Sequence, residues 1–214
     1  MFVKMLLAKE IESYIYGLEP SDHVILFYDT LEGKRNILYR FLADGLGKKK
    51  GLVYICSDES PDQVRSGLES YGVDVGGNEE AGRLLIRNYD EWYIERGRAE
   101  ALKIITHWNE AYNRFSGRGL GMRVTGETSC FFRKNMVREL LRYEYALHKI
   151  LTIPMEAICA YDLKTIVDTG YKDMIMPLVR AHGKAIFASQ VGSMILEPEN
   201  VEDTDIEKLL EIKI

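Results

Sequence analysis

The sequence has no long hydrophobic run. None of its apolar segments approaches the roughly 20 residues that a helix needs to cross a bilayer, so we expect no membrane-spanning segment. Positive charge is also in short supply: the chain has 28 Lys and Arg residues and 33 Asp and Glu residues, which gives a net charge of -5. Without a basic field to attract a phosphate backbone, direct nucleic-acid binding is disfavoured.

Cysteine is rare and shows no pairing pattern. The three cysteines (Cys56, Cys130 and Cys159) are far apart, form no CxxC motif and follow no secretory leader. This usage is typical of a reducing compartment, so we expect a cytoplasmic protein without disulfides.

Histidine is equally scarce, with four in the chain: His23, His107, His148 and His182. No pair of them has metal-ligand spacing with a cysteine, so we expect neither a zinc site nor a histidine cluster. His23 and His182 both precede apolar runs and should lie, as structural residues, at the amino edge of the predicted sheet.

Hydrophobic residues make up 46% of the chain and concentrate in short runs with strand composition. The runs cover 23–28, 51–57, 83–88, 120–126, 155–161 and 184–189. Segments with helical spacing lie before and between them, at 4–18, 61–71, 98–115, 132–151 and 171–181. Strands that are apolar on both faces indicate a sheet covered by helices on both sides, so the prediction is an α/β, doubly wound, mostly parallel fold.

No linker or repeat interrupts this pattern, so residues 1–190 are predicted to form a single domain with a leading helix. Residues 191–214 form a C-terminal extension, in which SMILEP favours a short edge strand. The tail after it is ambiguous, because Ile206, Leu209 and Leu210 have helical spacing whereas Leu210, Ile212 and Ile214 alternate. In either form its apolar side should dock on the domain or on another subunit.

The segment YDTLEGKR, residues 28–35, follows the first of these strands and aligns with the phosphate loop G-x-x-x-x-G-K-[ST]. Gly33 and Lys34 match the motif, but Tyr28 replaces its first glycine and Arg35 replaces the hydroxyl that holds magnesium. Asp29 and Glu32 add repulsion of a polyanion, on the order of 1–4 kcal/mol. The loop should not support efficient phosphoryl transfer, and an ordinary strand-to-helix turn remains the alternative.

Polar residues follow most of the predicted strands, and ligands of open α/β sheets bind beyond the carboxyl ends of the strands. Asp and Ser are also simply common in such turns. Arg123 lies inside the fourth strand and needs a partner, for which Glu127 and Asp162 are candidates. The candidate ligand-binding residues are Tyr28, Asp29, Gly33, Lys34, Arg35, Asp58, Glu59, Trp92, Arg123, Glu127, Phe131, Tyr161 and Asp162, of which Tyr28, Trp92, Phe131 and Tyr161 would form the walls.

Several longer blocks resemble known proteins. GKRNILYRFLADGL, GLVYICSDESPDQVRSGLESYGVDV and GRLLIRN together are similar to the core of KaiC-type RecA-like ATPases. The chain resembles the MEDS family, the methanogen/methylotroph DcmR sensory domain, still more closely. The shared blocks are DHVILFYD, YICSDES, RVTGE, LLRYEYALH, ICAYD and AHGKAIF, which together extend over roughly residues 15–190.

The MEDS resemblance implies a RecA-like three-layer sandwich with an eroded nucleotide site. It implies a non-catalytic sensory domain for a small organic ligand, such as a hydrocarbon derivative, whose output passes through a signalling partner or an oligomer. Two alternatives stay open: an ATP-binding switch or slow ATPase that uses Mg-ATP, and a structural adaptor. For the ATPase, the resemblance places Lys34 at the phosphate lysine, Asp58 and Glu59 at the acidic position after the second strand, and Glu127 near the magnesium-binding acid.

Overall fold

The protein is described by a computed structural model that covers residues 2–6, 8–189, 192–197 and 208–210. Within these residues, eight strands form one sheet in the order β1-β8-β7-β2-β6-β5-β3-β4. Their bounds are Phe2–Leu6 (β1), His23–Tyr28 (β2), Lys50–Cys56 (β3), Leu84–Asn88 (β4), Gly121–Glu127 (β5), Met155–Asp162 (β6), Lys184–Ser189 (β7) and Gly192–Glu197 (β8). The six neighbours from β7 to β4 run parallel, and the predicted α/β class is confirmed.

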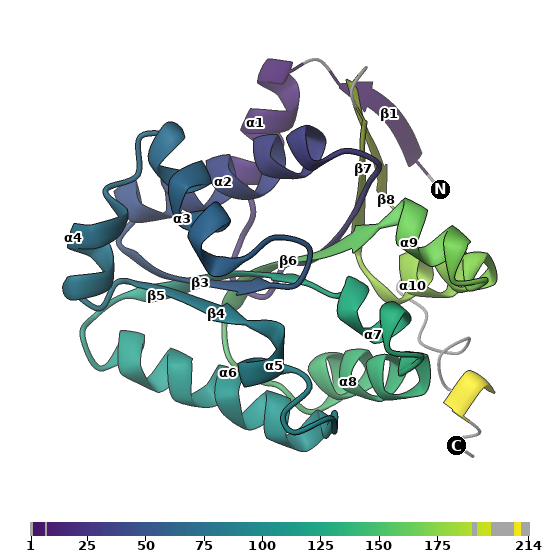
Figure 1. Cartoon of the computed structure of the whole chain (residues 1–214). Coiled ribbons are helices and arrows are strands. Elements are labelled where there is room, and N and C mark those ends of the chain that lie inside the picture. The colour runs from purple at the N-terminus through teal and green to yellow at the C-terminus, as the bar shows by residue number, and fades with distance from the viewer. Residues whose placement is uncertain (1, 7, 190–191, 198–207, 211–214) are drawn as a thin grey trace.

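Helices cover both faces of the sheet (Figure 1). One face carries α1 (Ala8–Tyr16), α2 (Leu31–Gly47), α3 (Pro61–Ser70) and α4 (Val75–Glu80). The other carries α5 (Tyr89–Trp92), α6 (Ala101–Ser116), α7 (Ser129–Arg133), α8 (Val137–Lys149), α9 (Leu163–Asp168) and α10 (Ile175–Ala181), with the short 3-10 helix η1 (Lys172–Met174) before α10. None of the helices within the described ranges is long and apolar enough to cross a membrane.

Alternation along the central strand β2 creates two cores. Ile25 and Phe27 point into the layer of α6 and α8, whereas Val24 and Leu26 point into the layer of α2 and α3. All four side chains are fully buried, each worth about 1.5–3 kcal/mol relative to exposure. This double burial explains why the strand reads as a continuous apolar run, and it produces three layers.

Two details at the far edge differ from the sequence-based expectation. The leading helix predicted over 4–18 is shorter, because residues 2–6 form β1 and the helix spans only Ala8–Tyr16. The segment predicted as an edge strand is β8, which lies between β7 and β1. Antiparallel pairing of β1 with β8 overrides the local helical spacing, since strand formation depends on a partner that the local pattern does not show.

The tail is described only in part. Residues 208–210 are helical, and Leu210 is buried against the core of the α6 and α8 layer. Ile206, Ile212 and Ile214 lie outside the described residues.

Candidate functional site

A cavity of about 480 Å³ opens at the carboxyl ends of β2, β3 and β6. Such an edge is where α/β sheets bind ligands. We call it the crevice cavity. Its lining consists of Tyr28, Asp29, Thr30, Leu31, Ser57, Asp58, Tyr89, Arg133, Asp162 and Lys164.

A hydrogen-bond network around Asp58 shapes one wall of the crevice cavity. The Asp58 carboxylate accepts from the Tyr28 hydroxyl, from Arg133 Nη1 at 2.6 Å and from Ser129 Oγ at 3.0 Å. Burial, with Asp58 as the next cause, raises the pKa of Tyr28, so this hydroxyl stays protonated and donates. Arg133 is exposed and its guanidinium therefore lies at the mouth.

The turn that resembles a phosphate loop is a capped helix start. Thr30 is the N-cap of α2, and its Oγ1 accepts a hydrogen bond from the Gly33 amide at 3.2 Å. Because α2 begins at Leu31, Gly33 and Lys34 belong to the first helical turn. The cap thus uses one of the backbone N–H groups that could otherwise face an anion.

Lys34 is fully buried between two carboxylates. Its Nζ lies 2.5 Å from Glu127 Oε1 and 2.7 Å from Glu59 Oε2. Burial alone would lower the pKa of Lys34, but the charges of Glu127 and Glu59 and their hydrogen bonds outweigh it and raise the pKa. The ammonium is therefore charged and its donors are directed at protein groups.

Both carboxylates are held by further donors. Glu127 accepts from the Tyr54 hydroxyl at 2.6 Å and from the backbone amides of Ser57 at 2.6 Å and Asp58 at 2.5 Å. Glu59 also accepts from Arg35 Nε at 3.0 Å. We call the buried Lys34, Glu59 and Glu127, together with the half-buried Arg35, the buried ion network. A buried network with its lone pairs and protons filled is stable as it stands, whereas removing one partner costs about 3–5 kcal/mol.

The structure divides the candidate residues other than Arg123 into three groups. Tyr28, Asp29, Asp58 and Asp162 line the crevice cavity. The buried ion network lies next to it, joined to it through the Asp58 amide and through Gly33 in the first turn of α2. Trp92, Phe131 and Tyr161 pack in the core of the α6 and α8 layer and do not line the crevice cavity.

Arg123 lies elsewhere. Its guanidinium is paired with Glu156 and lies 2.6 Å from Asp44, so the predicted pairing with Glu127 or Asp162 is wrong. The reason is register: Arg123 lies directly opposite Glu156 on the neighbouring strand, four residues before the carboxyl end of β5. At about 3.3 Å per residue it sits roughly 13 Å from that edge.

Sequence reasoning missed six lining residues: Thr30, Leu31, Ser57, Tyr89, Arg133 and Lys164. All six follow a strand at the carboxyl edge. Thr30 and Leu31 come after β2, Ser57 directly after β3 and Tyr89 directly after β4, whereas Arg133 lies in α7 after β5 and Lys164 two residues after β6. Their proximity to strand ends was visible in the sequence, but the prediction favoured acidic residues at these positions.

The expectation that the histidines do not cluster is also wrong. Side chains of His23, His148 and His182 meet Glu144, and their ligand-type atoms all lie within 4.8 Å of one another. His23 opens β2, so the group lies at the amino edge of the sheet, as its strand position predicts. His107 is elsewhere, with Nδ1 3.2 Å from the carbonyl oxygen of Trp92.

Comparison with solved structures defines the class of fold. The structure is similar to a KaiC-like protein of the hyperthermophilic archaeon Pyrococcus horikoshii OT3, with a TM-score of 0.58, 15% identity and coverage of 87% of this chain and 76% of the other. It is also similar to an uncharacterized protein of Pyrococcus horikoshii in complex with an unknown peptide, with a TM-score of 0.64, 13% identity and coverage of 90% and 89%. These likenesses place the chain among proteins with the RecA-like three-layer fold.

Comparison with family models gives the particular family. Residues 22–182 match the model of MEDS, the methanogen/methylotroph DcmR sensory domain, and the chain belongs to this family. No curated protein sequence matches the chain significantly.

Proposed function

We propose that the protein is a non-catalytic sensory domain that binds a small polar organic molecule in the crevice cavity. One observation carries the proposal. A ligand-sized cavity lies at the carboxyl edge of a RecA-like sheet, while Lys34, which aligns with the phosphate-loop lysine, is paired with Glu127 and Glu59. At about 480 Å³, the crevice cavity falls in the usual range of ligand sites.

The charges of the lining indicate the chemistry of the ligand. Three carboxylates, Asp29, Asp58 and Asp162, accompany two cations, Arg133 and Lys164. This balance disfavours a triphosphate and favours a compound with hydroxyl groups, which can donate to the carboxylates and accept from Arg133. The ligand would favour one arrangement of the surrounding loops only to the extent that it binds that arrangement more tightly. A signalling partner or a second copy of the chain would bind one of these loop arrangements in preference to the other.

An ATP-binding switch or slow ATPase is the alternative that the fold supports. For Lys34 to reach a phosphate, its ammonium would have to leave two carboxylates at 2.5 and 2.7 Å. That rearrangement leaves Glu127 and Glu59 facing each other in a dry site, which is expensive. A structural adaptor is the third option, and here the buried Leu210 shows that part of the tail packs on the domain.

Native mass spectrometry of the full chain, followed by calorimetry with short alcohols and diols, tests the proposal. We expect one compound of these classes to bind, and Arg133→Ala to weaken it at least about tenfold, about 1.4 kcal/mol. Arg142→Ala removes an exposed cation of α8 that does not line the crevice cavity and serves as the control. Magnesium-ATP binding that disappears in Lys34→Ala would instead support the switch. Equal affinity in wild type and Arg133→Ala contradicts the proposed cavity.

A further inference from the structure

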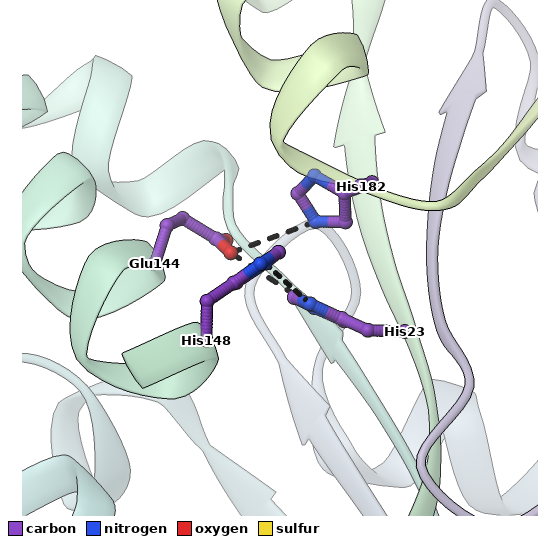
Figure 2. A group of neighbouring side chains, drawn as sticks. All are labelled: His23, Glu144, His148 and His182. Atoms are coloured by element: carbon purple, nitrogen blue, oxygen red, sulfur yellow. Dashed lines mark hydrogen bonds and ion pairs between the residues drawn. The ribbon is translucent and has the colours of Figure 1, made fainter. Parts of the chain in front are cut away.

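The cluster of His23, Glu144, His148 and His182 lies at the opposite edge of the sheet from the crevice cavity. His23 is the first residue of β2 and Tyr28 the last, a separation of roughly 16 Å along the strand. Glu144 and His148 are one turn apart on α8 and therefore share a face of the helix, while His182 follows α10. Figure 2 shows the four side chains pointing toward one another from these elements.

The distances between the polar atoms are those of a compact group. His23 Nδ1 lies 2.8 Å from His148 Nε2, and His182 Nε2 lies 3.5 Å from Glu144 Oε2. His23 Nε2 is 3.9 Å from the same carboxylate oxygen. Ligand atoms around a tetrahedral zinc ion, with bonds of about 2.0–2.1 Å, are roughly 3.3 Å apart. The separations of Glu144 Oε2 from His182 Nε2 and from His23 Nε2 lie near this value, at 3.5 and 3.9 Å. One ligand atom from each of the four residues lies within 4.8 Å of the others, so small side-chain movements suffice to enclose an ion.

Two of these atoms lack the partners that buried polar atoms normally have. Glu144 and His182 are completely buried, and Glu144 Oε2 and His182 Nε2 make no hydrogen bond to any described residue. His182 Nδ1 lies 2.7 Å from the Leu178 carbonyl oxygen and must donate to it, so Nε2 presents a lone pair. A carboxylate oxygen and an imine nitrogen thus face each other as two acceptors, an arrangement that needs a shared cation or proton.

Neighbouring groups orient these ligands as they would at a metal centre. The Leu178 carbonyl fixes the tautomer and direction of His182, and the Tyr161 hydroxyl donates to Glu144 Oε1 at 2.5 Å. Such outer partners accompany nearly all metal-bound histidines and carboxylates. Because Nδ1 of His182 donates to the Leu178 carbonyl, its Nε2 carries the lone pair that can bind a metal.

The site also has an approach from solvent. A second cavity, of about 260 Å³, includes both His23 and His148 in its lining, together with Asp22, Thr152 and Met155. The side chain of His23 is 16% exposed, whereas that of Glu144 is fully buried. An ion could enter past the two histidines and meet the carboxylate beneath them.

We propose that His23, Glu144, His148 and His182 bind a divalent transition-metal ion of the zinc and ferrous iron class. Three imidazole nitrogens and one carboxylate oxygen suit these ions, whereas magnesium and calcium prefer an all-oxygen set. The ion replaces the proton that the facing acceptors would otherwise share. It also ties α8 to β2 and to the connection between α10 and β7, independently of any ligand in the crevice cavity.

Metal analysis of the full chain, purified without chelator, is the first test. We expect about one zinc or iron ion per chain. After chelation, Zn²⁺ or anaerobic Fe²⁺, added separately, should raise the midpoint of thermal unfolding, and the ion with the higher affinity identifies the native metal. Glu144→Gln and His182→Gln should bind it at least about tenfold more weakly. Tyr161→Phe, which loses only the outer hydrogen bond to Glu144, should weaken binding by about 10–100-fold.

His107→Gln is the matched control, because this fourth histidine lies outside the cluster. It should bind metal as the wild type does, and far-UV circular dichroism of every variant excludes unfolding as the cause of a loss. Chelated wild type that gains neither stability nor bound metal from Zn²⁺ or Fe²⁺ overturns the proposal. So does a folded Glu144→Gln or His182→Gln variant that binds with wild-type affinity, because the facing acceptors would then be bridged by a proton alone.

Discussion

The two ends of the parallel sheet treat a buried carboxylate in opposite ways. At the carboxyl edge, Glu127 accepts from an ammonium, a hydroxyl and three backbone amides. At the amino edge, Glu144 accepts from one hydroxyl at Oε1, and its Oε2 faces the unprotonated nitrogen of His182. The first carboxylate is complete within the protein, and the second is not.

This difference affects stability and ligand binding in opposite directions. A carboxylate whose lone pairs all accept hydrogen bonds stabilises the native state and has no free acceptor for a ligand. A buried carboxylate with an unmatched oxygen costs free energy until something supplies the missing charge or donor. At the edge that carries Gly33 and Lys34, the buried charges are thus paired within the protein, whereas at the opposite edge Glu144 Oε2 has no hydrogen-bond donor among the described residues.

The largest effect should come from Glu127→Gln. This change places an amide NH2 among donors and leaves Lys34 with one carboxylate fewer, so we expect the free energy of unfolding to fall by about 3–5 kcal/mol. Urea denaturation measures it. Combining the change with Lys34→Met should recover part of the loss, because the double variant buries no unpaired ammonium. A single variant as stable as the wild type contradicts the proposed importance of the network.

The acid response of the buried ion network should be the next largest effect. Burial opposes ionisation of Glu59, but hydrogen bonds from Arg35 and Lys34 outweigh it and hold the pKa of Glu59 below its ordinary value of 4.5. Because the folded pKa is the lower one, this contribution is complete above about pH 4.5 and is lost as the pH falls through the folded pKa.

Glu59→Gln should therefore be less stable than the wild type at pH 7, by about 2 kcal/mol, and the gap should narrow as the solution is acidified. Urea midpoints measured from pH 7 down to the onset of acid unfolding give the comparison. A gap that stays constant over this range would show that Glu59 does not gain its stability from ionisation.

Features that depend on local sequence could be predicted, whereas pairings between residues far apart in the sequence could not. Strands were predictable because β2 and β6 are buried on both faces and read as continuous apolar runs. The position of Asp58 and Asp162 at one edge followed from parallel strands. Partner choice was not readable: Arg123 pairs with Glu156 through sheet register, and Lys34 with Glu127 across 93 positions.

The histidine cluster shows the same limit. Its members come from β2, α8 and the segment after α10, and only Glu144 and His148, four residues apart, show local spacing. A search for cysteine and histidine pairs could not find it. The pattern Glu-x-x-x-His on a helix, together with histidines near strand starts, would have predicted this cluster.

A smaller effect of opposite sign is expected from Glu144→Gln in the presence of chelator. The same carboxylate-to-amide change that harms the carboxyl edge here replaces an unmatched oxygen with an amide that can donate to His182 Nε2. We expect the metal-free protein to gain about 1 kcal/mol in the free energy of unfolding. Urea denaturation of chelated wild type and variant decides it. A loss comparable to that of Glu127→Gln would show that the two edges are equivalent after all.

The smallest effect should be at the rim of the crevice cavity. Lys164 lines the cavity and is exposed, and its ion pair with Asp168 lies one turn along α9 in solvent. Since exposed pairs contribute little, Lys164→Ala should leave the urea midpoint unchanged. If the same variant weakens binding of the organic ligand, the loss is then a lost contact and not an unfolded domain. A marked drop in the midpoint would mean that Lys164 contributes to the stability of this edge, and a loss of ligand binding in the variant could then not be assigned to a lost contact.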